Sequence, residues 1–191
     1  LRKVIDVVPF GLQDKAAART GSGLGIRNNK FDIGDEDKVL LWGGGIWDWF
    51  DPLTVIKAIA LVKEKQPRIK LYFMGWKSPN PKVEVMGMAH RSMELARELG
   101  LLDKHVFFED DWIPYNDRVN YLLDADIAVS AHFDLPETRY SFRTRILDYL
   151  WVGLPVLSTG GDPLSEEIDR QGAGYALPYE SPEAWAEKID L

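Results

Sequence analysis

Short apolar runs alternate along the chain with longer segments in which apolar residues recur at every third or fourth position. Continuous apolar runs of this kind are typical of strands that a parallel sheet buries on both faces. Six such runs occur, at residues 39–42, 69–74, 106–108, 127–130, 155–158 and 174–177. We therefore predict a sheet of about six buried strands.

The segments between the runs have the spacing of amphipathic helices. Residues 52–65 follow Asp51 as a helix cap and carry Pro52 at the first helical position. The same spacing predicts three further helices, at residues 88–99, 117–123 and 145–152. Repeated alternation of strand and helix indicates an α/β fold with a doubly wound, Rossmann-like parallel sheet. Ligands of such sheets bind beyond the carboxyl ends of the strands, so the segments that follow each strand are candidates for function.

The two ends of the chain differ from this middle part. Residues 1–38 are polar and glycine-rich, with no clear strand apart from residues 4–8, and we interpret them as an interdomain linker and a mobile loop. Residues 39–180 make up the predicted Rossmann-like domain, and residues 181–191 begin a helix that the end of the chain cuts short. Because the chain also lacks an initial methionine, we expect it to be part of a longer protein.

The composition supports one globular domain and argues against several kinds of site and partner. The 191 residues are 46% apolar and 28% charged, which suits a domain with a core of its own. The chain has no cysteine, and its three histidines lie far apart in sequence, so we expect no metal site. The net charge of −7 argues against nucleic-acid binding, which needs a basic surface. No apolar run reaches the roughly 18 residues of a membrane helix, and we expect a cytoplasmic protein.

Glycines and aromatic residues follow the first predicted strand. The glycines are Gly43, Gly44 and Gly45. Glycine lets the backbone approach a phosphate or the reacting end of a sugar, although a tight turn with positive φ is the alternative. The aromatic residues are Trp47, Trp49 and Phe50. They could floor a sugar pocket, form a buried plug or contact another domain, and the sequence leaves these interpretations open.

Residues 141–158 combine a helix start with two arginines. Ser141 is a candidate cap, and Arg143 and Arg145 lie in the first turn that it would begin. Free N–H groups and forked guanidinium donors at a helix start favour an anion such as a diphosphate. Asp148 shares a helix face with Arg145, where its carboxylate could accept hydrogen bonds from ribose hydroxyls. An ion pair between Arg145 and Asp148 within the helix is the alternative, and it stays open.

Two later loops carry further candidates. After the third strand an acidic pair precedes Trp112 and Ile113, which lie where a doubly wound sheet would hold a nucleotide base. After the fourth strand Asp134 and Glu137 could accept hydrogen bonds from hydroxyl groups. The alternative for the acidic residues of both loops is a solvated surface.

Four segments carry motifs that can be compared with a known family. They are VIDVVPFGL, KVLLWGGGIWDWFDPLTVIKAIALV, VFFEDDWIPYNDRVNYLLDADIAVSAH and LDYLWVGLPVLSTGG. Together they resemble the C-terminal domain of B-type glycosyltransferases, which have two Rossmann domains, and specifically the large retaining family numbered four (group 1). The resemblance implies a domain that binds a nucleoside-diphosphate sugar and needs no metal or other cofactor. It also implies that Asp124 and Asp126 are structural, although Asp-Ala-Asp matches a metal motif literally.

The resemblance assigns site residues position by position. The family's ribose-binding glutamate falls on Asp148, and the glutamate that contacts the donor sugar falls on Tyr140. The family's Gly-Phe-Gly reads Ser141, Phe142 and Arg143. Its arginine and lysine after the first strand have no counterparts here.

We hypothesise that other residues replace the ones that are lost. Arg143 and Arg145 would supply the missing positive charge from the helix side. Glu137 would take the place of the absent first glutamate.

These inferences predict the donor-binding half of a retaining glycosyltransferase that acts on a glycan or lipid-linked acceptor, as in polysaccharide biosynthesis. The acceptor site would lie on a missing N-terminal domain, so we expect this chain alone to be inactive. That domain would also make any contact with the inner face of the membrane. Two alternatives stay open: half of a sugar-nucleotide epimerase, and a degenerate module that acts as a partner or scaffold.

Overall fold

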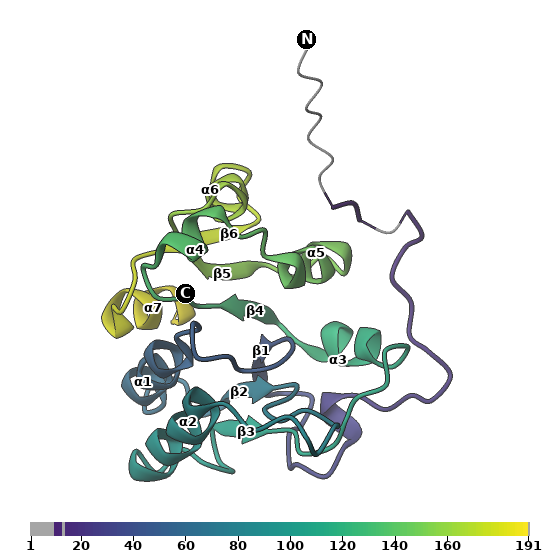
Figure 1. Ribbon diagram of the computed structural model, residues 1–191. Helices are drawn as coiled ribbons and strands as arrows, with labels where there is room; N and C mark the ends of the chain where they lie inside the picture. The colour runs from purple at the N-terminus through teal and green to yellow at the C-terminus, as the bar shows by residue number, and fades with distance from the viewer. Residues whose placement is uncertain (1–9, 13, 191) are drawn as a thin grey trace.

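The computed structural model describes residues 10–12 and 14–190. Its centre is a parallel sheet with the strand order β3-β2-β1-β4-β5-β6 (Figure 1). The strands are β1 (Lys38–Trp42), β2 (Ile69–Phe73), β3 (Val106–Phe108), β4 (Ile127–Ser130), β5 (Val156–Thr159) and β6 (Gly174–Leu177). The predicted α/β fold with a doubly wound parallel sheet is confirmed, and every strand lies where an apolar run predicted it.

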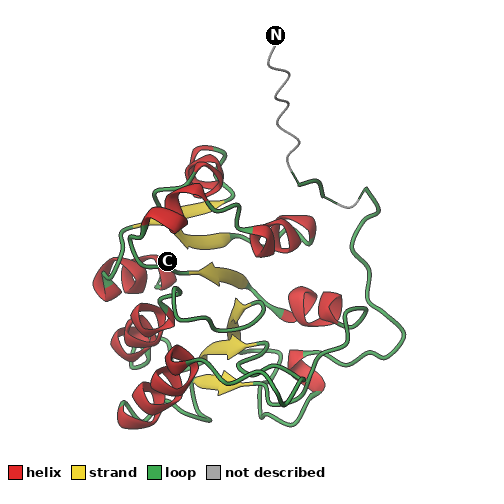
Figure 2. Cartoon of the chain, in the orientation of Figure 1, coloured by secondary structure: helices red, strands yellow, loops and turns green. Residues whose placement is uncertain are grey.

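Helices cover both faces of the sheet, as the red helices on either side of the yellow strands show (Figure 2). One face is packed by α1 (Pro52–Val62), α2 (Gly87–Glu98) and α7 (Pro182–Ile189). The other is packed by η1 (Ile26–Asn28), α3 (Arg118–Asp124), α5 (Thr144–Trp151) and α6 (Pro163–Arg170). The short helix α4 (Pro136–Tyr140) follows β4 at the carboxyl edge of the sheet.

Strand β1 shows why its apolar run is continuous. Leu40 and Trp42 point into the core beneath α1 and α2, whereas Val39 and Leu41 point into the core on the opposite face. All four side chains are fully buried. A strand with helices on both faces has no polar side, so its sequence shows a run and not an alternation.

The four helices predicted between strands are present with shifted ends, α7 lies where residues 181–191 were expected to begin a helix, and α4 and α6 were not predicted. Helix α6 nevertheless has a clear start signal. The side chain of Asp162 accepts hydrogen bonds from the backbone N–H groups of Leu164 and Ser165 at 3.0 and 3.1 Å, and Pro163 occupies the first turn.

The prediction that Ser141 caps the arginine-bearing helix is wrong. Helix α5 begins at Thr144 with Arg143 in the cap position, and Ser141 instead ends α4 by donating its N–H to the carbonyl of Glu137 at 2.8 Å. Pro136 contributes, because its fixed φ favours the first turn of a separate helix between β4 and α5.

Part of the N-terminal segment packs against the domain. Ile26 and Ile33 are buried in the core beneath α3, and the Arg19 guanidinium lies 2.5 Å from the Asp124 carboxylate. The strand considered at residues 4–8 lies outside the described residues, and the division at residues 38 and 180 stays a prediction. No helix in the described ranges is long and apolar enough to cross a bilayer.

Candidate functional site

Two adjoining cavities open at the carboxyl ends of the strands. Strands β1 and β4 are neighbours in the sheet, yet the chain leaves them toward opposite edges, which makes this the topological switch point. The first cavity has a volume of about 580 Å³ and the second about 780 Å³. Thr144 and Arg145 line both, so the start of α5 separates them.

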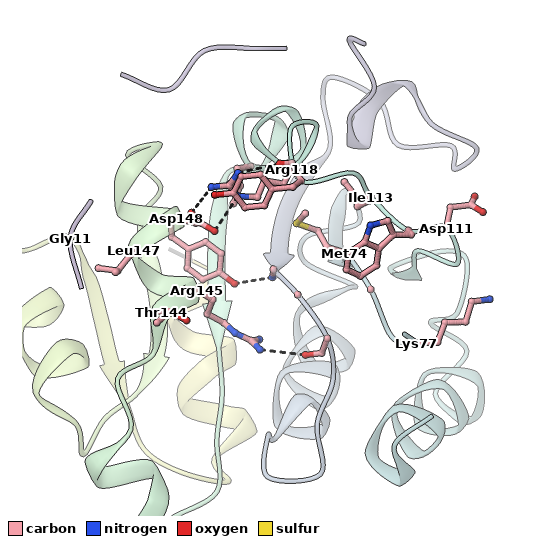
Figure 3. Close-up of a pocket in the computed structure, with 18 residues that line it drawn as sticks. Gly11, Met74, Lys77, Asp111, Ile113, Arg118, Thr144, Arg145, Leu147 and Asp148 are labelled. Atoms are coloured by element: carbon pink, nitrogen blue, oxygen red, sulfur yellow. Dashed lines mark hydrogen bonds and ion pairs between the residues drawn. The ribbon is translucent and has the colours of Figure 1, made fainter. Parts of the chain in front are cut away.

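The first cavity gathers loops from three strands and one face of α5 (Figure 3). Six of the predicted site residues line it: Gly44, Gly45, Trp112, Ile113, Arg145 and Asp148. Their positions in the sequence are far apart, and they meet only because parallel strands end at one edge of the sheet.

The glycine loop needs glycine for two separate reasons. The N–H of Gly43 donates a hydrogen bond to the Tyr149 hydroxyl at 2.8 Å, and a Cβ atom at Gly43 would lie 2.9 Å from that oxygen. Gly44 has a φ of 95°, which favours glycine. The tight-turn interpretation is therefore correct, and the same turn exposes its backbone to the cavity.

Arg145 brings a positive charge to the junction of the cavities. Its guanidinium carbon lies 4.3 Å from the ring centre of Phe50, and Nη2 lies 3.4 Å from the carbonyl oxygen of Gly45. Nη1 is buried, and within residues 10–12 and 14–190 it has no hydrogen-bond partner. Burial lowers the pKa of Arg145, and the nearby Arg143 lowers it further, although a guanidinium keeps its proton at neutral pH.

The helix does not contain the considered ion pair between Arg145 and Asp148. Asp148 pairs instead with Arg118 of α3, whose Nη2 and Nε lie 3.2 and 3.4 Å from its carboxylate oxygens. The Arg118 guanidinium stacks 3.7 Å from the ring centre of Tyr115. Asp148 stays at the rim of the first cavity with 42% of its side chain exposed, and its oxygens keep further acceptor capacity.

Arg143 does not offer the second positive charge that the sequence predicts. Its Nε lies 3.1 Å from Oδ2 of Asp162, and both side chains are almost fully buried. Nη1 donates to the Ser158 and Thr159 hydroxyls at 2.9 and 3.0 Å. Burial lowers the pKa of Arg143 and Asp162 opposes that change. The charge is thus already compensated, and Arg143 ties the start of α5 to the start of α6.

The remaining predicted residues line the second cavity. They are Glu137, Ser141, Phe142 and Arg143, which lie opposite Trp47, Trp49, Phe50 and His132. Tyr140, at the position of the family's first glutamate, is 89% exposed and lies outside the lining of both cavities. Glu137 thus lines a cavity and Tyr140 does not. This agrees with the hypothesis that Glu137 takes the place of the absent first glutamate.

The acidic pair before Trp112 is exposed, by 54% at Asp110 and 85% at Asp111, as the solvated-surface alternative expects, but the preceding Glu109 is buried. Glu109 is 3% exposed and accepts hydrogen bonds from the Tyr72 hydroxyl at 2.6 Å and from the backbone N–H of Asp111 at 3.1 Å. Lys30 lies 2.7 Å from the same carboxylate. Burial and the neighbouring Glu109 raise the pKa of Tyr72. This network anchors the loop that carries Trp112 into the first cavity.

Sequence reasoning missed Lys77 and Arg118, which also line the first cavity. Lys77 follows β2, so the rule that ligands bind beyond strand ends could have identified it. Its Nζ lies 3.5 Å from the Asp110 carboxylate. The contact between Arg118 and Asp148 joins two helices and has no signal in the sequence.

The two aspartates of the Asp-Ala-Asp triplet have structural partners. Asp124 pairs with Arg19, and Asp126 accepts the N–H of Val39 at the start of β1 at 2.8 Å. In the described part of the chain no three His, Asp or Glu side chains gather as a metal site requires. Whether the protein's chemistry needs a metal stays a prediction.

Comparisons with known proteins agree with this geometry. The family model described as "Glycosyl transferases group 1" matches residues 37–191. A sequence search of curated proteins found no match.

Solved structures with the same fold come from several bacteria. A glycosyltransferase from Rickettsia africae is 23% identical with a TM-score of 0.63, and the match covers 81% of this chain and 37% of that one. The C-terminal domain of the group 1 glycosyltransferase LpcC from Francisella tularensis is 19% identical with a TM-score of 0.63, over 81% of this chain and 74% of that one. Anabaena HepE in complex with UDP-glucose is 17% identical with a TM-score of 0.64, over 81% and 38%. The chain thus spans well under half the length of the Rickettsia and Anabaena proteins.

Proposed function

This chain belongs to the group 1 glycosyltransferases, and from that premise we propose that its first cavity binds the nucleoside diphosphate of a sugar donor. The whole enzyme would transfer the sugar to a glycan or lipid-linked acceptor with retention at the anomeric carbon. This chain would contribute the donor site, and an N-terminal domain would contribute the acceptor site.

The observation that carries the proposal is that Arg145 has no carboxylate partner among the described residues. Arg145 is partly buried and its Nη1 is fully buried, so an anionic ligand would recover free energy that this desolvation costs. Its guanidinium lies beside the glycine loop, so the backbone N–H groups of that loop and the arginine can bind one diphosphate from two sides. This supports the hypothesis that positive charge comes from the helix side, with Arg145 alone in that role.

The other lining residues match the remaining parts of a nucleotide. Asp148 lies three residues beyond Arg145 on the same side of α5 and lines the same cavity, so a ribose that follows the diphosphate can reach it. Its carboxylate can accept hydrogen bonds from vicinal hydroxyls while Arg118 holds it in place. Trp112 and Ile113 then form the wall for the base. The fold of HepE, whose complexes contain UDP and UDP-glucose, supports the same assignment.

Arg145 also has a role in the transfer step. The bond from the anomeric carbon to the β-phosphate oxygen breaks, a bond from the anomeric carbon to the acceptor oxygen forms, the acceptor proton passes to the departing phosphate oxygen, and negative charge grows on the departing diphosphate. A cation already held beside that group stabilises the charge without rearrangement. We propose that no metal is needed for donor binding, so a chelator such as EDTA should leave the affinity unchanged. A location at the inner face of the membrane and a role in polysaccharide synthesis fit this proposal.

Calorimetric titration of the chain with UDP, GDP, ADP and TDP tests the proposal. One diphosphate should bind, and Arg145→Met should weaken its binding by at least about tenfold, the loss of one strong charge-assisted contact. Arg170→Ala is the matched control because Arg170 is exposed on α6 and pairs only locally with Glu167.

Two results would count against the proposal. If Arg145→Met leaves the affinity unchanged, the diphosphate binds away from Arg145. Binding of none of the four would favour the scaffold alternative.

A further inference from the structure

The second cavity begins where the proposed diphosphate site ends. Thr144 and Arg145 line both cavities, so a diphosphate bound beside Arg145 would have its β-phosphate at the mouth of the second one. The next group of the donor is the sugar. This inference therefore rests on the proposed function and concerns which sugar the cavity accepts.

One wall of the second cavity is aromatic. The rings of Trp47 and Trp49 stack with centroids 5.3 Å apart and an angle of 5° between their planes. Both are partly exposed, by 37% and 49%, and the wall continues through Phe50. Large apolar surface left open beside a cavity indicates a binding surface, and the C–H face of a sugar ring is a suitable partner for flat aromatic rings.

His132 adds a polar group to this apolar pocket. It is 4% exposed, lies edge-on to Phe50 with ring centres 4.8 Å apart, and lines the cavity. Its Nδ1 is buried, with no hydrogen-bond partner in the described ranges. Burial, together with Arg143 and Arg145, lowers the pKa of His132 to about 2. A neutral imidazole has one donor and one acceptor nitrogen, which suits a sugar hydroxyl.

The charges around the cavity disfavour an acidic sugar. Asp162 compensates Arg143, and the diphosphate would compensate Arg145. Glu137 then leaves the lining of the second cavity with a net negative charge. Glu137 is exposed at the rim of the cavity, so a sugar that carries its own carboxylate would meet a like charge there, and such repulsion disfavours that ligand relative to an uncharged sugar.

We propose that the second cavity binds the transferred sugar against Trp47 and Trp49 and selects an uncharged sugar over a uronic acid. The two tryptophans and His132 take over the recognition that the exposed Tyr140 does not provide. Glu137 contributes the discrimination against a carboxylate.

The test compares a nucleoside diphosphate with its sugar conjugates. UDP, UDP-glucose, UDP-galactose and UDP-glucuronate are titrated into the chain, and GDP, GDP-mannose and GDP-mannuronate are used if GDP is the diphosphate that binds. A neutral conjugate should bind more tightly than the diphosphate alone, and the uronate conjugate more weakly than the neutral one.

Three variants locate the effect. Trp49→Ala should weaken the neutral conjugate by roughly tenfold and leave the bare diphosphate unchanged, because only the conjugate reaches the aromatic wall. Trp112→Ala, on the base side of the first cavity, should weaken both ligands alike. Tyr140→Ala should change neither. Trp49 and Trp112 are both well exposed, so neither substitution removes a core residue.

The outcomes separate this inference from the proposed function. If Trp49→Ala weakens the bare diphosphate as much as its conjugate, or if the uronate conjugate binds as tightly as the best neutral one, the inference is overturned while the donor site stands. If no diphosphate binds at all, the proposed function fails and the inference fails with it.

Discussion

Arg143 and Arg145 are two residues apart at the start of one helix, yet their surroundings differ in the property that decides function. Arg143 points into the protein, where the Asp162 carboxylate compensates its charge and two hydroxyl groups accept hydrogen bonds from its Nη1, although its buried Nη2 has no partner among the described residues. Arg145 points to the junction of two cavities, where it has aromatic rings and one carbonyl but no carboxylate among the described residues. The comparison shows that an arginine can bind an anionic ligand only where no carboxylate of the protein already compensates its charge. The predictions below test each side of this difference.

The largest effect is expected at the compensated arginine. Asp162→Asn keeps an acceptor that can cap α6 but leaves Arg143 as a buried charge without a carboxylate partner. The free energy of unfolding should fall by about 3 kcal/mol, as it does when one member of a buried pair is removed. Urea denaturation measures the change.

Asp134→Asn is the control for this variant. It removes an equally direct pair with Arg139, but both side chains are about half exposed, so the loss should stay below about 1 kcal/mol. Equal effects of the two substitutions would show that Arg143 is not a structural cation.

The next effect concerns ribose recognition beside Arg145. Asp148→Ala should weaken the bound nucleoside diphosphate by about tenfold, since hydrogen bonds from hydroxyls to a carboxylate are lost. Calorimetry with the 2′,3′-dideoxy form of the same nucleotide gives the control, because that ligand lacks both hydroxyls. It should bind the wild type and the variant equally. A loss of the same size for both ligands would assign Asp148 to some other role.

The fold follows from the sequence more closely than the site does, and particular residues show why. Leu40 and Leu41 lie on opposite faces of β1 and both are buried, so a continuous apolar run predicts the strand without any knowledge of its neighbours. Asp162 followed by Pro163 is a local helix signal that would have predicted α6. Local rules fail at Ser141, because an additional helix that begins at Pro136 ends there and α5 starts only at Thr144.

The site depends on contacts between distant segments. The positions of Gly44 and Trp112 follow from the rule that ligands bind at strand ends, and both line the first cavity. The partners of the charged residues do not follow from any such rule. Arg118 reaches Asp148 from another helix, and Asp162 at the start of α6 reaches Arg143 at the start of α5, so the sequence could not show which arginine would stay uncompensated.

The smallest effect is expected at the loop that carries Trp112. Lys30→Met removes the cation beside buried Glu109, and nucleoside diphosphate binding should weaken by about threefold, a modest loss because Lys30 is itself 41% exposed. Lys30→Arg should restore the affinity. Lys30 positions the base wall and does not touch the phosphates, so inorganic pyrophosphate should bind wild type and variant alike. A parallel loss of pyrophosphate binding would contradict this role.

The most direct test of the central claim is a crystal structure of this chain with the nucleoside diphosphate that binds it. The diphosphate should lie between the backbone of the Gly43–Gly45 loop and the Arg145 guanidinium, with Arg143 still paired to Asp162. A diphosphate that lies outside the first cavity, or one that separates Arg143 from Asp162 while Arg145 stays without an anion, would contradict the account.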